Sequence, residues 1–142
     1  MFRGKAACSA DSSKPSASRD PHDVVMINRI HPYADGDDLR ASGDFYVSLF
    51  GLEVAMDHPV LGLRSPDNPT AQLIIPARGM ESPQPRFGID VGEPESVDAT
   101  HAEAVRRGAR VVYPLTDEPW GVQRFFVQDP SGTVVNVLAH RR

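Results

Sequence analysis

The alternation of apolar and polar residues near the end of the chain predicts a β-hairpin. Residues 123–128 and 133–138 are rich in β-branched and aromatic side chains, which favour strands. The run Asp-Pro-Ser-Gly at 129–132 has the composition of a tight turn, because Asp caps turns, Pro presets φ and Gly accepts positive φ.

The two faces of this hairpin differ in chemistry. Successive strand side chains point to opposite sides, so one face carries only the apolar residues 125, 127, 135 and 137 and is expected to meet a helix. The other face mixes aromatic, aliphatic and polar side chains, namely Arg124, Phe126, Gln128, Val134, Asn136, Leu138 and His140. Apolar walls with a few polar groups are typical of a small-molecule cleft.

Two other stretches have apolar residues at helical spacing. The first covers 39–50 and is ended by Gly51; the second starts at 93–96, runs to 107 and is ended by Gly108. In the first helix Phe45, Tyr46, Leu49 and Phe50 are predicted to be core residues. Short β-branched segments predict the strands 24–30, 52–56, 60–63, 71–75, 87–91 and 109–113. Each half therefore has the order strand, helix, three strands, a βαβββ unit present twice.

The length of 142 residues fits one domain, or two small halves that share a core. We divide the chain into an N-terminal extension, residues 1–24, and two βαβββ modules, residues 25–79 and 80–142. The extension is rich in Ser, Ala, Lys, Pro and Asp, lacks the apolar region of a secretory signal, and is predicted to be disordered. Residues 76–85, with three prolines, are predicted to link the modules.

Charge, hydropathy and cysteine content exclude several classes of function. A formal net charge of -4 argues against nucleic-acid binding, because no basic stripe is present to contact phosphates. No apolar run is long enough for a membrane-spanning helix. The single cysteine, Cys8, cannot form an internal disulfide and fits a reducing compartment, so we predict a cytoplasmic protein.

Two motifs carry a resemblance to a known family. They are DLRASGDFYVSLFGLEV at 38–54 and WGVQRFFVQDPSGTVVNVL at 120–138. Together with the duplicated pattern, they resemble the vicinal oxygen chelate superfamily, which includes glyoxalase I, bleomycin resistance proteins and extradiol dioxygenases. The resemblance implies an α+β fold in which two βαβββ modules curve a mixed sheet around a cleft, with helices on the outer face. It also implies a homodimer.

Metal-using members of that superfamily bind a divalent ion at four inward strand positions. By the resemblance, these places fall on His31, Gln72, Asn136 and a position at or near Arg86. Only the imidazole is a good ligand, because an amide oxygen binds metals weakly and a guanidinium repels a cation. We therefore predict no metal ion and no cofactor.

The residues predicted to line a ligand site come from the strand faces and from the loop at 119–121. They are His31, Tyr33, Gln72, Arg86, Trp120, Arg124, Phe126 and Asn136. Two have alternatives: Trp120 can cover the cleft or fill a dimer contact. Arg124 can bind a ligand or form a salt bridge with Asp117, Glu118 or Asp129.

The leading hypothesis is a glyoxalase- or bleomycin-resistance-like protein that binds a small organic molecule without a metal ion. The alternative is a lyase, isomerase or dioxygenase. That enzyme would use a displaced metal site built on His31, or a metal-free mechanism with His31 or Tyr33 as acid or base. A structural domain that binds a macromolecular partner has no positive support in the sequence.

Overall fold

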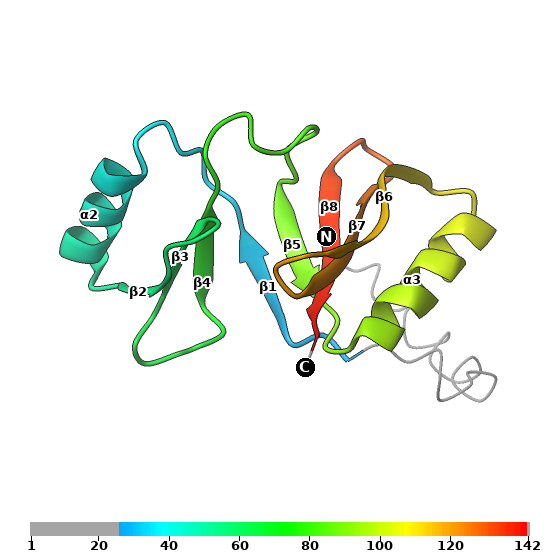
Figure 1. Cartoon of the computed structure of the whole chain (residues 1–142), viewed down its shortest axis with the longest axis horizontal. Helices are drawn as coiled ribbons and strands as arrows, with labels where there is room; N and C mark the ends of the chain where they lie inside the picture. Colours follow the sequence, from blue (N-terminus) through cyan, green and yellow to red (C-terminus); the bar gives the residue numbers. More distant parts are fainter. Residues whose placement is uncertain (1–25, 142) are drawn as a thin grey trace, which may run out of the picture.

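The computed structural model describes residues 26–141 and confirms the α+β fold with two βαβββ modules (Figure 1). The predicted extension, 1–24, lies outside the described residues. The first module contains β1 (Arg29–Pro32), α2 (Leu39–Phe50), β2 (Glu53–Met56), β3 (Leu61–Arg64) and β4 (Gln72–Ile75). The second contains β5 (Phe87–Asp90), α3 (Pro94–Arg106), β6 (Arg110–Glu118), β7 (Val122–Gln128) and β8 (Val134–His140).

The two modules are joined through their first strands. The second module forms a sheet in the order β5-β8-β7-β6, and β1 of the first module extends it by antiparallel pairing with β5. The remaining strands of the first module form a separate sheet, β2-β3-β4. A parallel bridge between Tyr33 and Ile74 connects β1 to this smaller sheet. In Figure 1, β1 accordingly lies between β5 and the smaller sheet.

The second module has the core that the hairpin pattern predicts. Phe125 and Val137, from the apolar face, pack with Val97 of α3, and the three side chains are between 0% and 5% exposed. Burying a side chain of this size contributes roughly 1.5–3 kcal/mol to folding. The contact fixes the helix on one face of the sheet, so the mixed face of the hairpin is directed away from α3.

The predicted turn is confirmed, and its side chains explain it. A carboxylate oxygen of Asp129 accepts hydrogen bonds from the backbone N–H groups of Ser131 and Thr133, at 2.8 and 2.9 Å. Gly132 has φ of 89°, a value that other residues rarely adopt. The turn sets the pairing of β7 with β8, in which Phe126 lies opposite Asn136.

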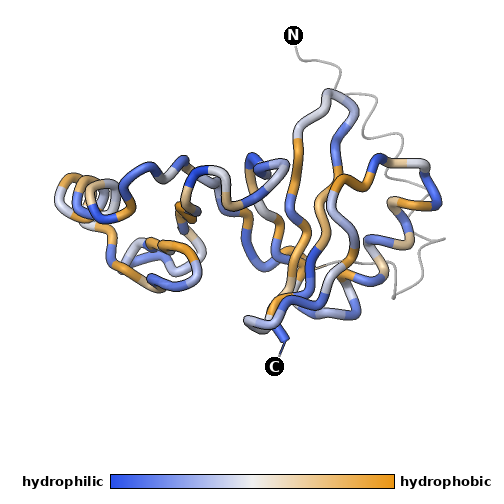
Figure 2. Tube along the Cα trace, turned by 45° about the horizontal axis from the view of Figure 1, so that its top comes forward, coloured by the Kyte–Doolittle hydropathy of each residue, from blue (hydrophilic) through white to orange (hydrophobic). Residues whose placement is uncertain are grey.

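The prediction for the apolar face of α2 is wrong for three of four residues in the single chain. Tyr46 packs against the cluster of Leu61, Leu63 and Ile75, but Phe45, Leu49 and Phe50 are between 54% and 63% exposed. The helix approaches β3 through Gly43, whose missing side chain leaves room for Leu61. The face with residues 45 and 49 therefore points outward, and apolar segments of α2 lie at the end of the molecule in Figure 2.

Two strands differ most from their predicted bounds: the first, predicted at 24–30, is observed as β1 at Arg29–Pro32, and β6 is longer than predicted. The sequence predicts a strand at 109–113, whereas β6 continues to Glu118 through two irregular pairings with β7. The additional residues of β6 place Glu118 near Arg124. No helix within residues 26–141 is long and apolar enough to cross a membrane.

Candidate functional site

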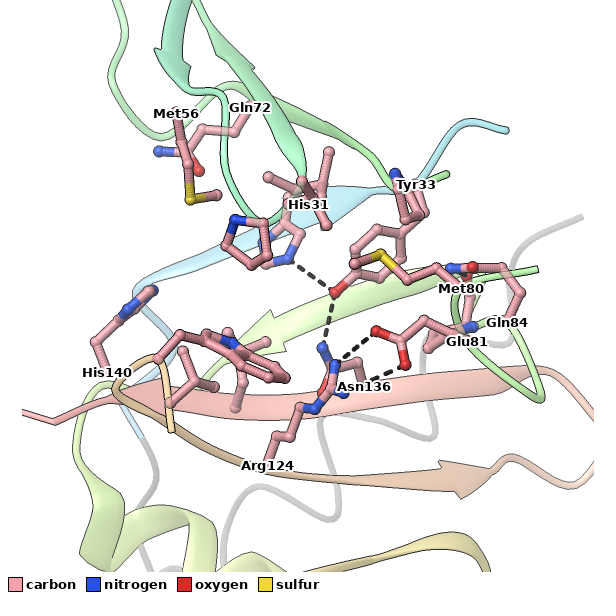
Figure 3. Close-up of a pocket in the computed structure, with 18 of the residues that line it drawn as sticks. His31, Tyr33, Met56, Gln72, Met80, Glu81, Gln84, Arg124, Asn136 and His140 are labelled. Carbon is pink, nitrogen blue, oxygen red and sulfur yellow. Dashed lines mark hydrogen bonds and ion pairs between the residues drawn. The ribbon is translucent and has the colours of Figure 1, made fainter. Parts of the chain in front are cut away.

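A cavity of about 840 Å³ lies between the two modules. The first module contributes side chains from β1, β2, β3 and β4, and the second contributes side chains from β6, β7 and β8. The linker 76–85 supplies a further part of the wall, which includes Met80, Glu81 and Gln84 (Figure 3). The cavity is thus enclosed by segments that are far apart in the sequence.

Six of the eight predicted site residues line this cavity, and two do not. The six are His31, Tyr33, Gln72, Trp120, Arg124 and Asn136. Phe126 is fully buried below the cavity wall, because the Arg124 guanidinium lies 5.0 Å from the centroid of its ring and covers it. Arg86 is exposed and precedes β5.

The strand register shows which residue occupies the place assigned to Arg86. His31 of β1 pairs with Gly88 of β5, and Gly88 in turn pairs with Asn136 of β8. Gly88 is therefore the counterpart of His31 in the second module, two residues after Arg86, at or near which the third position is predicted. Gly51 and Gly108 end the corresponding helices of the two modules. Adding their separation in sequence to position 31 gives position 88, so this comparison could have identified Gly88 from the sequence.

His31, Tyr33 and Asn136 form a buried hydrogen-bonded cluster in the cavity wall (Figure 3). The side-chain amide of Asn136 donates to the Tyr33 hydroxyl at 2.7 Å. That hydroxyl can then donate to Nε2 of His31, 3.3 Å away, which leaves the imidazole proton on Nδ1. Within residues 26–141, Nδ1 of His31 and Oδ1 of Asn136 have no hydrogen-bond partner.

The cluster is uncharged at neutral pH. Burial, together with the nearby Arg29 guanidinium, lowers the pKa of His31 from 6.5 to about 4. Burial also raises the pKa of the Tyr33 hydroxyl. Both groups therefore offer neutral hydrogen-bonding atoms rather than charges.

A second polar cluster is centred on Arg124. Its Nε donates to Glu118 at 2.8 Å, and its two terminal nitrogens donate to the Glu81 carboxylate at 2.9 and 3.2 Å. The rings of Tyr113 and Trp120 lie 5.0 and 5.4 Å from the guanidinium carbon. The predicted salt bridge with Glu118 is thus present, whereas ligand binding by Arg124 remains a prediction.

The sequence of this protein matches a described family. The model of the Glyoxalase/Bleomycin resistance protein/Dioxygenase superfamily matches residues 31–137. The chain belongs to this superfamily. The match begins within β1 and ends within β8, and so covers both modules. No curated protein matches the chain.

Several solved structures share the fold of this chain. A structure described as an NAD-dependent benzaldehyde dehydrogenase from Legionella pneumophila has a TM-score of 0.63 at 17% identity, covering 79% of this chain and 97% of that one. The structure of methylmalonyl-CoA epimerase from Streptomyces coelicolor has a TM-score of 0.61 at 19% identity, covering 82% of this chain and 100% of that one. The structure of a 2,3-dioxygenase from Pseudomonas sp. KL28 has a TM-score of 0.59 at 17% identity, covering 83% of this chain and 42% of that one. At these identities the likeness establishes the fold alone.

The four places where metal-using members of the superfamily hold ligands do not fit a divalent ion here. They carry one imidazole, from His31, the amides of Gln72 and Asn136, and no side chain at Gly88. Zinc and other transition metals require imidazole, thiolate or carboxylate ligands, and at least three of them in most sites. Residues 26–141 also contain no group of three or more His, Cys, Asp or Glu side chains placed to hold a metal.

Sequence reasoning missed several residues of the cavity wall. Arg29 shares the inward face of β1 with His31, so strand alternation could have found it; its guanidinium is paired with Asp90 at 3.0 Å. Glu81 gave no signal, because periodicity does not set side-chain direction in a proline-rich linker. The pairing of Glu81 with Arg124 is a tertiary contact across 43 residues.

We predict that Gly88→Ala disrupts the site. A methyl group at Gly88 would lie 2.5 Å from Nε2 of His31 and 3.0 Å from the Tyr33 hydroxyl, so the cluster would have to shift. The free energy of unfolding should fall by about 1–3 kcal/mol in urea titrations. Gly62→Ala is the matched control, since its nearest neighbour would be 3.4 Å away. Equal stability of the two variants would contradict this packing.

We also predict that the free energy of unfolding falls as pH decreases from 6.5 toward 4. Folding lowers the pKa of His31 to about 4, so the stabilisation is complete above pH 6.5 and is lost as the unfolded state binds the proton. This contribution amounts to about 3 kcal/mol. The measurement is the free energy of unfolding from urea titrations at each pH. The dependence of this free energy on pH should become weaker in His31→Gln, whereas His58→Gln, at an exposed position, should keep the dependence of the wild type.

Proposed function

We propose that the chain binds a small organic molecule in the cavity between its modules, without a metal ion. The observation that carries this proposal is the wall of the cavity: aromatic and aliphatic side chains surround two compact polar clusters. A volume of about 840 Å³ lies within the range of typical small-molecule sites. The net charge of -4 also favours a small molecule over a nucleic acid.

The neutral cluster suits recognition better than proton transfer. A base whose conjugate acid has a pKa of about 4 removes protons poorly at neutral pH, and Tyr33, with its raised pKa, is a weaker acid than usual. A metal-dependent lyase, isomerase or dioxygenase is supported less, because the four superfamily places supply a single imidazole. Binding therefore remains the leading function, in the cytoplasm that the cysteine content favours.

A second copy of the chain is the proposed partner. Phe45, Leu49 and Phe50 of α2 and Val54 of β2 are each more than half exposed. An apolar surface of this kind is unusual on a protein that stays monomeric. Two-fold symmetry would place the same surface on both copies, so that apolar side chains meet apolar side chains.

Filling the cavity should abolish binding while leaving the fold intact. Ala55 is exposed at the cavity wall, so Ala55→Trp adds an indole there without displacing core atoms. A thermal-shift screen against aromatic and carbonyl compounds should give ligands that stabilise the wild type and not this variant. The same stabilisation is expected with and without a chelator.

The control for this experiment is Ala102→Trp, an equal change on the exposed side of α3 and outside the cavity wall. It should bind as the wild type does. Ligands that stabilise Ala55→Trp fully would locate binding elsewhere. Stabilisation that requires a divalent ion would contradict the metal-free proposal.

Leu49→Glu should convert the homodimer to a monomer, because it places a carboxylate in the proposed apolar contact. Light scattering after gel filtration gives the mass in solution, with a dimer expected for the wild type. Val105→Glu on α3 is the matched control, since Val105 is 57% and Leu49 61% exposed. A wild-type chain that is monomeric at micromolar concentration would refute this assignment.

A further inference from the structure

The guanidinium of Arg124 is held at its two ends by different parts of the chain. Its Nε is bound by Glu118, which lies beside it in the β6-β7 hairpin and is itself fixed by the Tyr113 hydroxyl at 2.6 Å. Its two terminal nitrogens point to Glu81 of the linker. The hairpin therefore fixes the position of Arg124, and Glu81 adds a second carboxylate from outside.

This arrangement holds one more negative charge than Arg124 can balance. Glu118 alone matches the single positive charge of the guanidinium, so Glu81 is not required to neutralise it. Glu81 is also the more exposed of the two, with a side chain that is 18% accessible against 8% for Glu118. Its carboxylate can turn to solvent without leaving a buried charge unpaired, because Glu118 still pairs with the guanidinium.

The end of Arg124 that binds Glu81 has the geometry of a carboxylate site. Two parallel N–H donors facing two carboxylate oxygens is the arrangement that gives arginine its preference for such groups. Trp120 and Tyr113 flank the guanidinium, and both rings line the cavity. Figure 3 shows the Glu81 carboxylate facing the Arg124 guanidinium in the cavity wall.

We propose that the ligand of this cavity is an organic carboxylate that replaces Glu81 at Arg124. This inference rests on the proposed function and specifies its ligand class. The exchange is non-covalent and conserves charge, because one carboxylate leaves the guanidinium for solvent as another arrives. Glu81 thus acts as an internal occupant of the site, and its release frees the linker from the second module.

The test compares benzoate with benzamide, which have the same ring and differ in charge. Glu81→Gln removes the competing carboxylate, so its affinity for benzoate in calorimetric titrations should exceed that of the wild type about tenfold, with benzamide unchanged. Glu103→Gln is the matched control: it makes the same charge change on α3, where Glu103 pairs with Arg106 and Arg107. It should bind benzoate as the wild type does.

A second variant keeps the positive charge at position 124 but removes the two parallel N–H donors of the guanidinium. In Glu81→Gln/Arg124→Lys the gain for benzoate should disappear, because an ammonium cannot donate two parallel hydrogen bonds. Equal benzoate affinity of the wild type and Glu81→Gln, or an equal gain for benzamide, would overturn the proposal. If uncharged compounds still bind in a way that Ala55→Trp abolishes, the carboxylate inference alone has failed; if that substitution has no effect, the cavity is not the binding site.

Discussion

The antiparallel pairing of β1 with β5 is the contact on which the rest of the site depends. It is the ladder that joins the two modules, and its register aligns His31 with Gly88 and, through β8, with Asn136. Because side chains alternate along a strand, a shift of one residue would turn the inward face of β1 outward. The cavity therefore exists only in this register, and the missing side chain at Gly88 is what allows the neutral cluster to close.

The two polar clusters of the cavity limit the free-energy cost of burying polar groups in different ways. His31, Tyr33 and Asn136 remain uncharged, which avoids the large cost of desolvating ions. Arg124 cannot lose its proton, so its charge requires a carboxylate; Glu118 supplies one and Glu81 adds a second. The wall thus combines a neutral cluster with guanidinium groups that are paired with carboxylates, at Arg124 and at Arg29.

Much of the fold could be predicted from the sequence because local rules determine it. The Asp129 turn, the Gly51 helix end and the apolar face of β7 and β8 follow from residues close in the chain. Tertiary contacts were harder: the direction of Glu81 and the reach of β6 to Glu118 depend on partners distant in sequence. The exposed side of α2 was misjudged because helical periodicity shows which residues share a face, not whether that face is covered.

The residues at the four inward strand positions affect what the proposed site could recognise. In a metal site of this superfamily the four inward strand positions would carry the strongest local charge. Here those positions are neutral, and a guanidinium paired with two carboxylates lies on a different strand of the cavity wall, at Arg124 of β7. A ligand would therefore be oriented by a guanidinium near the linker and by neutral hydrogen bonds at the module junction. If the proposed function holds, such an arrangement would separate the charged and uncharged ends of a ligand and so select it by shape and polarity.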